Sequence, residues 1–413
     1  MSREWEMTTL GEICRRGGGE IRTGPFGSQL HSSDYVTEGV PSVMPTNIGD
    51  NRIIEEGIAR ITEADAHRLS QHRLKEGDII YSRRGDVEKR ALVRRREVGW
   101  LCGTGCLKVR LGNGVVDPLY ASYWLGHPDI KEWIVRHAVG ATMPNLNTSI
   151  MSAVPFALPP LAEQKRISHI LGTLDDKIEL NRRMNATLEA MARALFQSWF
   201  VDFDPVRRNA ERGDSRPEDT LFPDSFEESE LGEIPKGWRV MKVGDFVERL
   251  SVGQKYDQKT VFPVGKVPVL DQGKSGVIGF HNNEPGVTAT LVKPVAVFAN
   301  HTCYMRLITY SFSAIQNVLP FVGSGVDTFW AYYATEGRLS FSEYKGHWPD
   351  FVIQESVVPP RELTDAFGIL AKLLVAKMRN NDEESRTLAM LRDTLLSKLL
   401  SGELNLTDLQ LKA

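Results

Sequence analysis

Two long stretches of the sequence carry the same heptad pattern of apolar residues. The first stretch has one series at Ile167, Leu174, Asn181, Leu188 and Leu195, and a second at Leu171, Ile178, Asn185, Ala192 and Trp199. The other stretch has Phe367, Leu374, Asn381, Leu388 and Leu395. This spacing predicts two coiled-coil helices with a polar centre. A double proline precedes each, which favours a helix start there, and about 40 residues of helix extend ~60 Å.

The two stretches are copies of each other at an offset of 200 residues. Pro159 and Pro160 correspond to Pro359 and Pro360, and the matches continue in phase through Leu195 and Leu395. The globular parts repeat more loosely. Each opens with a tryptophan, at 5 or 238, and closes with an aromatic helical segment and a strand-like exit, whereas their middles differ. The chain is therefore predicted to hold one frame twice, with two different interiors.

These elements predict an α+β fold with a pseudo-two-fold internal repeat. Two mixed globular domains are expected to be separated by two long antiparallel helices. The predicted divisions are a first globular domain at 1–157, a central helix at 158–200, an acidic linker at 201–234, a second globular domain at 235–357, and a C-terminal helix and tail at 358–413. The linker is rich in charged, proline and serine residues, so it is expected to be flexible and exposed.

An asparagine occupies the same heptad position in both copies. Asn181 opposite Asn381 would fix the register of an antiparallel pair, because a buried amide is satisfied by another polar group at its level. The alternative is that both side chains face solvent on separate helices. The heptads of one sequence leave this choice open.

Charge is distributed unevenly along the chain. The net charge is −3, with 20 basic and 19 acidic residues in 1–155, 12 and 10 in 235–355, but 4 and 11 in 200–234. The acidity thus lies in the predicted linker, and the globular parts are close to neutral. Such domains would bind DNA weakly alone, since phosphate neutralisation supplies most non-specific affinity, so a more basic partner is expected.

Catalytic and metal-binding patterns are missing from the sequence. The four cysteines, Cys14, Cys102, Cys106 and Cys303, lack zinc-site spacing and are expected to be reduced and buried. The run Gly273-Lys274-Ser275 lacks the first glycine of a phosphate-binding loop. No nucleophile, base and orienting group occur together, so we expect no catalytic residue, no bound metal and no enzyme activity. The lack of a signal peptide or an 18-residue apolar run predicts a cytoplasmic protein without a membrane segment.

In the first copy, three turn-like segments are candidates for contact with DNA. The residues are Gly24, Phe26, Ser28, Gln29, Arg83, Arg84, Asn145 and Asn147. Glycines around Phe26 allow a tight turn, arginines suit guanine edges or phosphate, and amides suit adenine. Each has a structural alternative: Phe26 in the core, the arginines solvated, and the asparagines capping the next segment.

In the second copy, two polar turns after strand-like runs have the corresponding place. Their candidate residues are Gln272, Lys274, Ser275, Asn300 and His301. Each residue is a weak signal by itself. Their similar placement in two copies is what favours a shared role in binding.

Several of these segments together resemble the specificity subunits of type I restriction–modification systems. The resemblance is carried by LPPLAEQKRI at 158–167, LDDKI at 174–178, SWFVDFDP at 198–205, LLSKLLSGEL at 395–404 and GPFGS at 24–28. It spans essentially the whole chain and is most specific in the helical segments. After the second double proline the sequence RELT, at 361–364, departs from the LAEQ pattern.

The resemblance implies a non-catalytic, DNA-reading subunit. Each globular domain would be a target-recognition domain for one half of a bipartite, asymmetric double-stranded site. The helices would set the spacing and dock two modification (methyltransferase) subunits, and restriction (motor-nuclease) subunits would join for cleavage. S-adenosylmethionine, ATP and Mg would be bound by those partners, with no cofactor on this chain. The alternative is a coiled-coil protein–protein scaffold without direct DNA contact.

Overall fold

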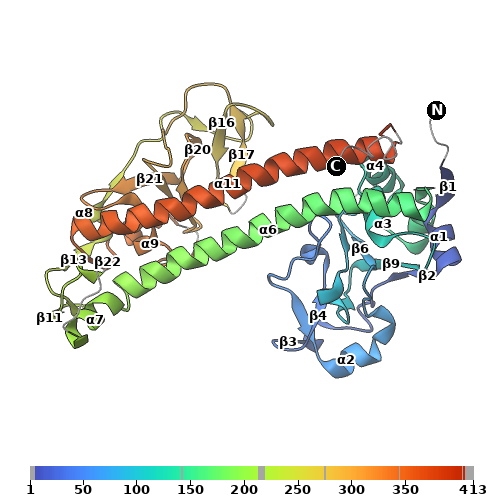
Figure 1. Ribbon diagram of the computed structural model, residues 1–413, viewed down its shortest axis with the longest axis horizontal. Helices are drawn as coiled ribbons and strands as arrows, with labels where there is room; N and C mark the ends of the chain where they lie inside the picture. The colour runs from blue at the N-terminus through green and yellow to red at the C-terminus, as the bar shows by residue number, and fades with distance from the viewer. Residues whose placement is uncertain are drawn as a thin grey trace, which may run out of the picture. The chain divides into compact units, whose positions relative to one another are not determined.

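The computed structural model describes residues 5–140, 143–212, 219–273, 276–343, 345–401 and 403–404. It forms two compact units (Figure 1). The first unit comprises Met1–Glu179 and Ser385–Ala413, and the second comprises Leu180–Glu384. Each unit therefore contains one globular part and portions of two long helices.

The first unit is built on two four-stranded sheets. The main sheet, entirely antiparallel, has the order β2 (Gly18–Thr23), β9 (Cys106–Gly112), β6 (Ile79–Ser82), β7 (Arg90–Leu92). The smaller sheet has the order β3 (Tyr35–Val36), β5 (Ala59–Ile61), β4 (Val40–Val43), β8 (Leu101–Cys102), in which β4 and β8 are parallel. A third pairing joins β1 (Glu6–Thr9) to β10 (Pro155–Leu158). The helices of this globular part are α1 (Leu10–Gly17), α2 (Glu63–Arg68), α3 (Pro118–Trp124), α4 (Pro128–His137) and α5 (Thr148–Ser152).

The second unit repeats this plan. Its antiparallel sheet has the order β14 (Val247–Arg249), β21 (Val318–Gly323), β18 (Val295–Ala299), β19 (Met305–Ile308). Its smaller sheet has the order β15 (Lys255–Tyr256), β20 (Ser313–Ile315), β16 (Val267–Leu270), β17 (Val277–His281). The pairing of β13 (Arg239–Lys242) with β22 (Glu355–Val358) matches that of β1 with β10. Its helices include α8 (Val243–Phe246), α9 (Thr328–Thr335) and α10 (Trp348–Val352).

Local sequence explains how the first unit begins. In α1 the apolar residues Leu10, Ile13 and Cys14 recur at helical spacing, and all three are buried. Thr9 caps the start of this helix by accepting a hydrogen bond from the Glu12 amide at 3.3 Å. Gly18 ends it with φ of 70°, a left-handed conformation that favours glycine. The chain can therefore turn directly from α1 into β2.

The two long helices have the predicted positions. Helix α6 (Leu161–Phe200) and helix α11 (Arg361–Leu400) each have 40 residues and follow a double proline. Every position of the predicted heptad series is buried or half-buried. Leu180, Met191, Leu370, Leu373 and Leu391 lie outside the series and are exposed. The apolar seam inferred from the sequence is therefore the packed one.

Contacts inside each unit show that the helices are antiparallel. In the second unit, Asn181 contacts Asn381, and Phe200 packs against Phe367 with ring centroids 5.5 Å apart. Residue numbers thus rise along α6 as they fall along α11. In the first unit, Asp175 binds Arg392 at 2.7 Å, and Ile167 shares a buried cluster with the end of α11. The predicted antiparallel fold is confirmed.

Amide side chains occupy the seam of the second unit. Asn181 and Asn381 are 0% and 1% exposed. Asn181 donates to the backbone oxygen of Asn381 at 3.3 Å and to Glu384 at 2.8 Å. Asn381 donates to the side-chain oxygen of Asn185 at 2.8 Å, and Asn185 donates to Asp382 at 2.7 Å. The amides are therefore linked through a shared network, and neither buried asparagine faces solvent.

The segment 201–234 differs from the flexible linker that its composition suggested. It contains helix α7 (Asp204–Arg212) and a hairpin of β11 (Phe226–Ser229) and β12 (Gly232–Pro235). Phe222 is buried and packs edge-on against Trp199 at 5.1 Å. The buried carboxylate of Asp219 pairs with Arg208 at 2.9 Å. A few aromatic anchors hold this otherwise acidic segment on the second unit, which an averaged composition does not reveal.

A single exchange tests the amide network. Asn181→Leu is expected to lower the free energy of unfolding by about 1–3 kcal/mol, because it removes the two hydrogen bonds that this buried amide donates across the seam. Urea unfolding followed by circular dichroism measures the change. Asn380→Leu is the matched control, since Asn380 is the exposed neighbour of Asn381, and its effect should stay within about 0.5 kcal/mol. Equal effects from the two exchanges would contradict a role for the buried amide.

Candidate nucleic-acid interface

The loop after β2 projects an aromatic ring from the first unit. Gly24 donates to the Cys106 carbonyl at 2.9 Å, and a Cβ added to Gly24 would lie 2.0 Å from the Gly103 oxygen, so this close approach requires glycine. A turn follows, in which the amide of Gln29 donates to the Phe26 carbonyl at 2.8 Å. The Phe26 ring is 54% exposed, so it is not the core residue that the alternative proposed.

Three segments that are distant in sequence meet around this loop. The guanidinium of Arg83 lies 5.6 Å from the centre of the Phe26 ring and also donates to the Leu146 carbonyl at 3.2 Å. Arg84 forms an antiparallel bridge with Asn145. The fold therefore brings Gly24, Phe26, Arg83, Arg84 and Asn145 onto one part of the first unit.

The candidate side chains in this group have different roles. Asn147 caps α5, because its side-chain oxygen accepts from the Ile150 amide at 2.8 Å. Gln29 accepts from the Phe26 amide at 3.1 Å and holds the loop together. Ser28 and Arg84 are exposed, and neither side chain has a polar partner within the described residues. Ser28, Arg84 and the Phe26 ring are thus the groups that the loops leave accessible.

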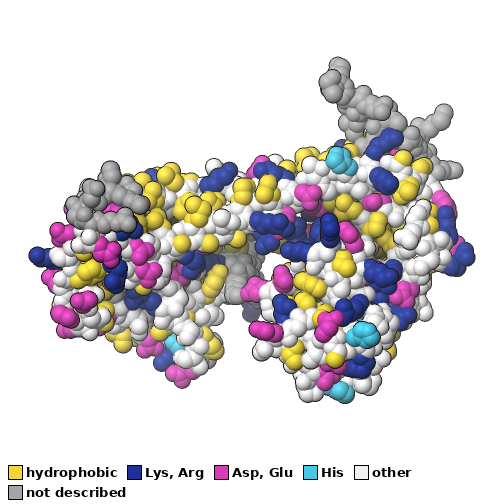
Figure 2. Space-filling model, turned by 60° about the horizontal axis from the view of Figure 1, so that its bottom comes forward, with side chains coloured by type: hydrophobic (Ala, Val, Ile, Leu, Met, Phe, Trp, Pro, Cys, Tyr) yellow, Lys and Arg dark blue, Asp and Glu magenta, His cyan; other side chains and the backbone are white. Residues whose placement is uncertain are grey.

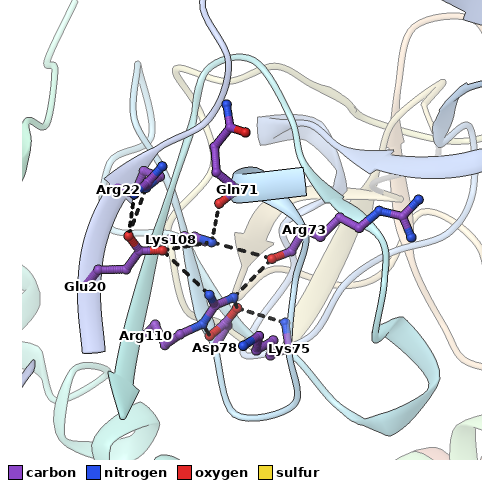
Figure 3. A network of polar contacts seen from close by, with 8 residues as sticks. All are labelled: Glu20, Arg22, Gln71, Arg73, Lys75, Asp78, Lys108 and Arg110. Atoms are coloured by element: carbon purple, nitrogen blue, oxygen red, sulfur yellow. Dashed lines mark hydrogen bonds and ion pairs between the residues drawn. The ribbon is translucent and has the colours of Figure 1, made fainter. Parts of the chain in front are cut away.

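A network of buried charges supports the strand that leads into the loop (Figure 3). Lys108 on β9 is 0% exposed and donates to the Gln71 carbonyl at 2.7 Å, with Glu20 of β2 3.3 Å away. Arg110 makes two bonds to the buried carboxylate of Asp78, at 2.8 and 2.6 Å. Burial lowers the pKa of Lys108, whereas the hydrogen bond to Asp78 raises the pKa of Arg110. The two cations lie on one face of β9 and tie it to β2 and to the segment at 71–78.

The candidate residues of the second unit also come together. The His301 amide donates to the side-chain oxygen of Gln272 at 3.0 Å. Asn300 accepts from the Trp348 amide at 2.9 Å, and the ring nitrogen Nδ1 of His301 lies 2.8 Å from the Lys345 carbonyl. Lys274 and Ser275 lie outside the described residues. The side-chain oxygens of Gln272 and Asn300 are used to join loops of the protein.

The two units place these loops in the same way. In the first unit the turn after β6 pairs with the residues before α5, and in the second the turn after β18 pairs with the residues before α10. Both turns follow the same strand of the shared sheet order. The frame is therefore repeated down to the loops, although the loop residues differ.

The part of the chain that the structure describes contains no group of three histidine, cysteine or acidic side chains placed to hold a metal ion. Within the same residues, no helix is both long and apolar enough for a membrane span. All four cysteines are buried and free, and burial raises the pKa of Cys102 to about 12.

Comparisons with known proteins show similarity to one family. A family model described as the type I restriction modification DNA specificity domain matches residues 2–190. The type I restriction enzyme MjaIX specificity subunit of Methanocaldococcus jannaschii is 23% identical over 433 aligned residues, covering 98% of this chain and 95% of that protein. Residues 2–190 thus match a type I restriction modification DNA specificity domain, and the similarity to a specificity subunit extends over nearly the whole chain.

Other proteins of the same description are also similar to this chain. The type I restriction enzyme HindI specificity subunit of Haemophilus influenzae is 28% identical over 214 residues, which is 50% of this chain and 43% of that protein. A crystal structure of a type I restriction–modification S subunit from M. genitalium has a TM-score of 0.53 at 16% identity and covers 96% of both chains. At 16% sequence identity, this similarity shows a shared fold and nothing more specific.

Sequence reasoning missed the charged network around Lys108 and Arg110. Lys108 and Arg110 alternate with Leu107, Val109 and Leu111 in one strand. Such alternation is normally read as a solvated face. Here one of the two cations is fully buried, because carbonyls and carboxylates of other segments reach it. One sign of this network was present in the sequence, namely a lysine and an arginine within an otherwise apolar strand-like run.

Removing one carboxylate tests whether this network holds the unit together. Asp78→Ala is expected to lower the free energy of unfolding by about 2–3 kcal/mol, because it removes both hydrogen bonds from Arg110 and the acceptor of the Lys75 amide. Thermal unfolding of the full chain measures the loss. Asp86→Ala removes an exposed carboxylate that pairs with Lys89 at 2.8 Å and should cost about 0.5 kcal/mol or less. Comparable losses from the two exchanges would contradict the proposed support.

Proposed function

We propose that this chain recognises a bipartite, asymmetric DNA sequence for a type I restriction–modification enzyme. Each globular part acts as a target-recognition domain and reads one half of the site. The long helices dock two modification subunits and set the distance between the halves. The chain performs no chemistry itself: methylation uses S-adenosylmethionine on the modification subunits, and cleavage uses ATP and Mg on the restriction subunits.

The observation that carries this proposal is one frame with two different sets of loops. Both units share the order of the main antiparallel sheet and the placement of the turns after β6 and β18. The side chains at those turns differ: Arg83 and Arg84 in one unit, Asn300 and His301 in the other. Since side chains in loops read base edges, equal frames with unequal loops suit two dissimilar half-sites.

The charge of the surface favours shared binding. Figure 2 shows basic and acidic side chains interspersed over the visible face of both globular parts. An interspersed surface provides little of the phosphate neutralisation on which non-specific DNA affinity depends. The modification subunits would therefore supply much of the contact with the phosphates.

Exposed apolar residues on the helices support docking of partners. Ile369 and Leu373 are each 60% exposed and lie one turn apart on α11, outside the packed seam. Met191 of α6 is 52% exposed and Met390 of α11 is 64% exposed. In Figure 2 hydrophobic side chains are visible along the long helices. Apolar side chains that the chain itself leaves uncovered are typical of protein–protein contact.

Exchange of one domain tests the proposed division of labour. Residues 1–157 replaced by the corresponding domain of another specificity subunit should change one half of the methylated sequence and leave the other half intact. Base-resolution methylation mapping in a host that also expresses the modification subunit gives the result. A change in both halves, or in neither, would contradict independent reading. A wild-type complex without any sequence preference would favour the scaffold alternative.

A charge placed on α11 tests the docking surface. Leu373→Glu should reduce co-purification of the modification subunit by about tenfold or more, because it introduces a charge into an apolar contact. The unfolding temperature should stay unchanged, since this side chain is exposed in the free chain. Ile353→Glu is the matched control: Ile353 is 59% exposed but lies outside the long helices. Full binding by Leu373→Glu would rule out this surface.

A further inference from the structure

A polar groove crosses the smaller sheet of the second unit. Two pockets, of about 550 and 650 Å³, adjoin there and share Lys255 and Gln316 in their linings. One extends along the end of β14 and the start of β21. The other is bordered by residues 255–260, by Gln272 and by Thr302. The labels β16, β17 and β20 mark this sheet in Figure 1.

The groove exists because the fourth strand of this sheet is placed differently in the two units. In the second unit β15 lies parallel to β20 at the edge of the sheet. In the first unit the strand that corresponds to β20 is β8, and the fourth strand, β3, lies at the opposite edge beside β5. Residues 255–260 therefore line a surface that the first unit does not repeat.

The floor of the groove is held by internal contacts. The Tyr256 ring is buried and stacks on His281 with centroids 4.1 Å apart, and His281 lies 2.9 Å from the hydroxyl of Ser313. The carboxylate of Asp257 accepts from the Thr260 amide at 3.0 Å, and that of Asp271 accepts from the Gly273 amide at 3.1 Å. The acidic groups at the groove thus have partners within the protein.

Three side chains at the groove are left uncommitted. Lys255, Gln258 and Gln316 are exposed, and none has a side-chain hydrogen bond or ion pair within the described residues. They differ in this respect from Gln272 and Asn300, whose oxygens already accept amide protons. A free carboxamide offers a donor and an acceptor side by side, the pattern that matches N7 and N6 of adenine in the major groove.

We propose that Gln258 and Gln316 read adenine edges in the half-site of the second recognition domain, with Lys255 binding the adjacent phosphate. This inference rests on the proposed function and names the residues that carry it in one half. The residues that read the bases lie in the groove, and the loops that contain Gln272 and Asn300 hold its wall in place. Within its described residues, the first unit has no strand in the place of β15, so it lacks this surface. The two half-sites are therefore read by different parts of the shared frame.

Two exchanges at Gln316 test the inference through methylation mapping of the complex with its modification subunit. Gln316→Ala should relax one position of one half-site, where discrimination in favour of adenine falls roughly 5- to 100-fold. Gln316→Glu replaces the donor by an acceptor and should shift that position toward cytosine, whose exocyclic amine donates. Gln258→Ala should relax a second position of the same half-site. In all three variants the other half-site should be unchanged.

Gln254→Ala is the matched control, because Gln254 is exposed and close in sequence to Lys255 but lines neither pocket. It should leave both half-sites intact. Unchanged half-sites in the three groove variants, or the same relaxation in Gln254→Ala, would overturn the inference. Those results still leave a bipartite site read by the wild-type complex, whereas failure of the proposed function removes the sequence preference of the wild type as well.

Discussion

The seam between α6 and α11 is the constraint on which the other parts of the molecule depend. A 40-residue helix with one apolar stripe is stabilised mainly by the partner that covers the stripe. Each globular part completes its core with helix residues from both copies: Ile167 and Leu399 in the first unit, Phe200 and Phe367 in the second. The domains are therefore built on the helix pair, and the buried amides fix how the two helices meet.

In each unit, some side chains hold the frame in place and others are exposed and free to make contacts. In the first unit, charges buried beside β9 tie the central sheet to the segment at 71–78, while Phe26 and Arg84 remain exposed above it. In the second unit, stacked Tyr256 and His281 form a floor under uncommitted glutamines. Side chains that are held by the protein keep the frame constant, and side chains without partners are the ones free to differ between targets.

Periodicity made much of the fold predictable. The heptads, the double prolines and the offset of 200 residues led to the long helices, their antiparallel packing and the repeated frame. The convergence of Phe26, Arg83 and Asn145 follows from the topology, which a single sequence does not give. The direction of a side chain could not be predicted either: Asn147 caps a helix, an alternative that the sequence left open, and the side-chain oxygen of Asn300 joins two loops. The edge position of β15 depends on tertiary packing, so the groove beside it had no local signature.

The order in which a ribosome delivers the chain has a consequence for how the first unit matures. Residues 180–384 form one continuous unit, whereas the first unit needs residues from 385 onward. Leu396, Leu399 and Leu400 belong to the same buried cluster as Leu10 and Ile167. Residues of the first unit before 180 are thus made earlier than the residues after 384 that complete their core. Until those later residues emerge, an apolar strip of the first unit is uncovered, and such surfaces are bound by chaperones.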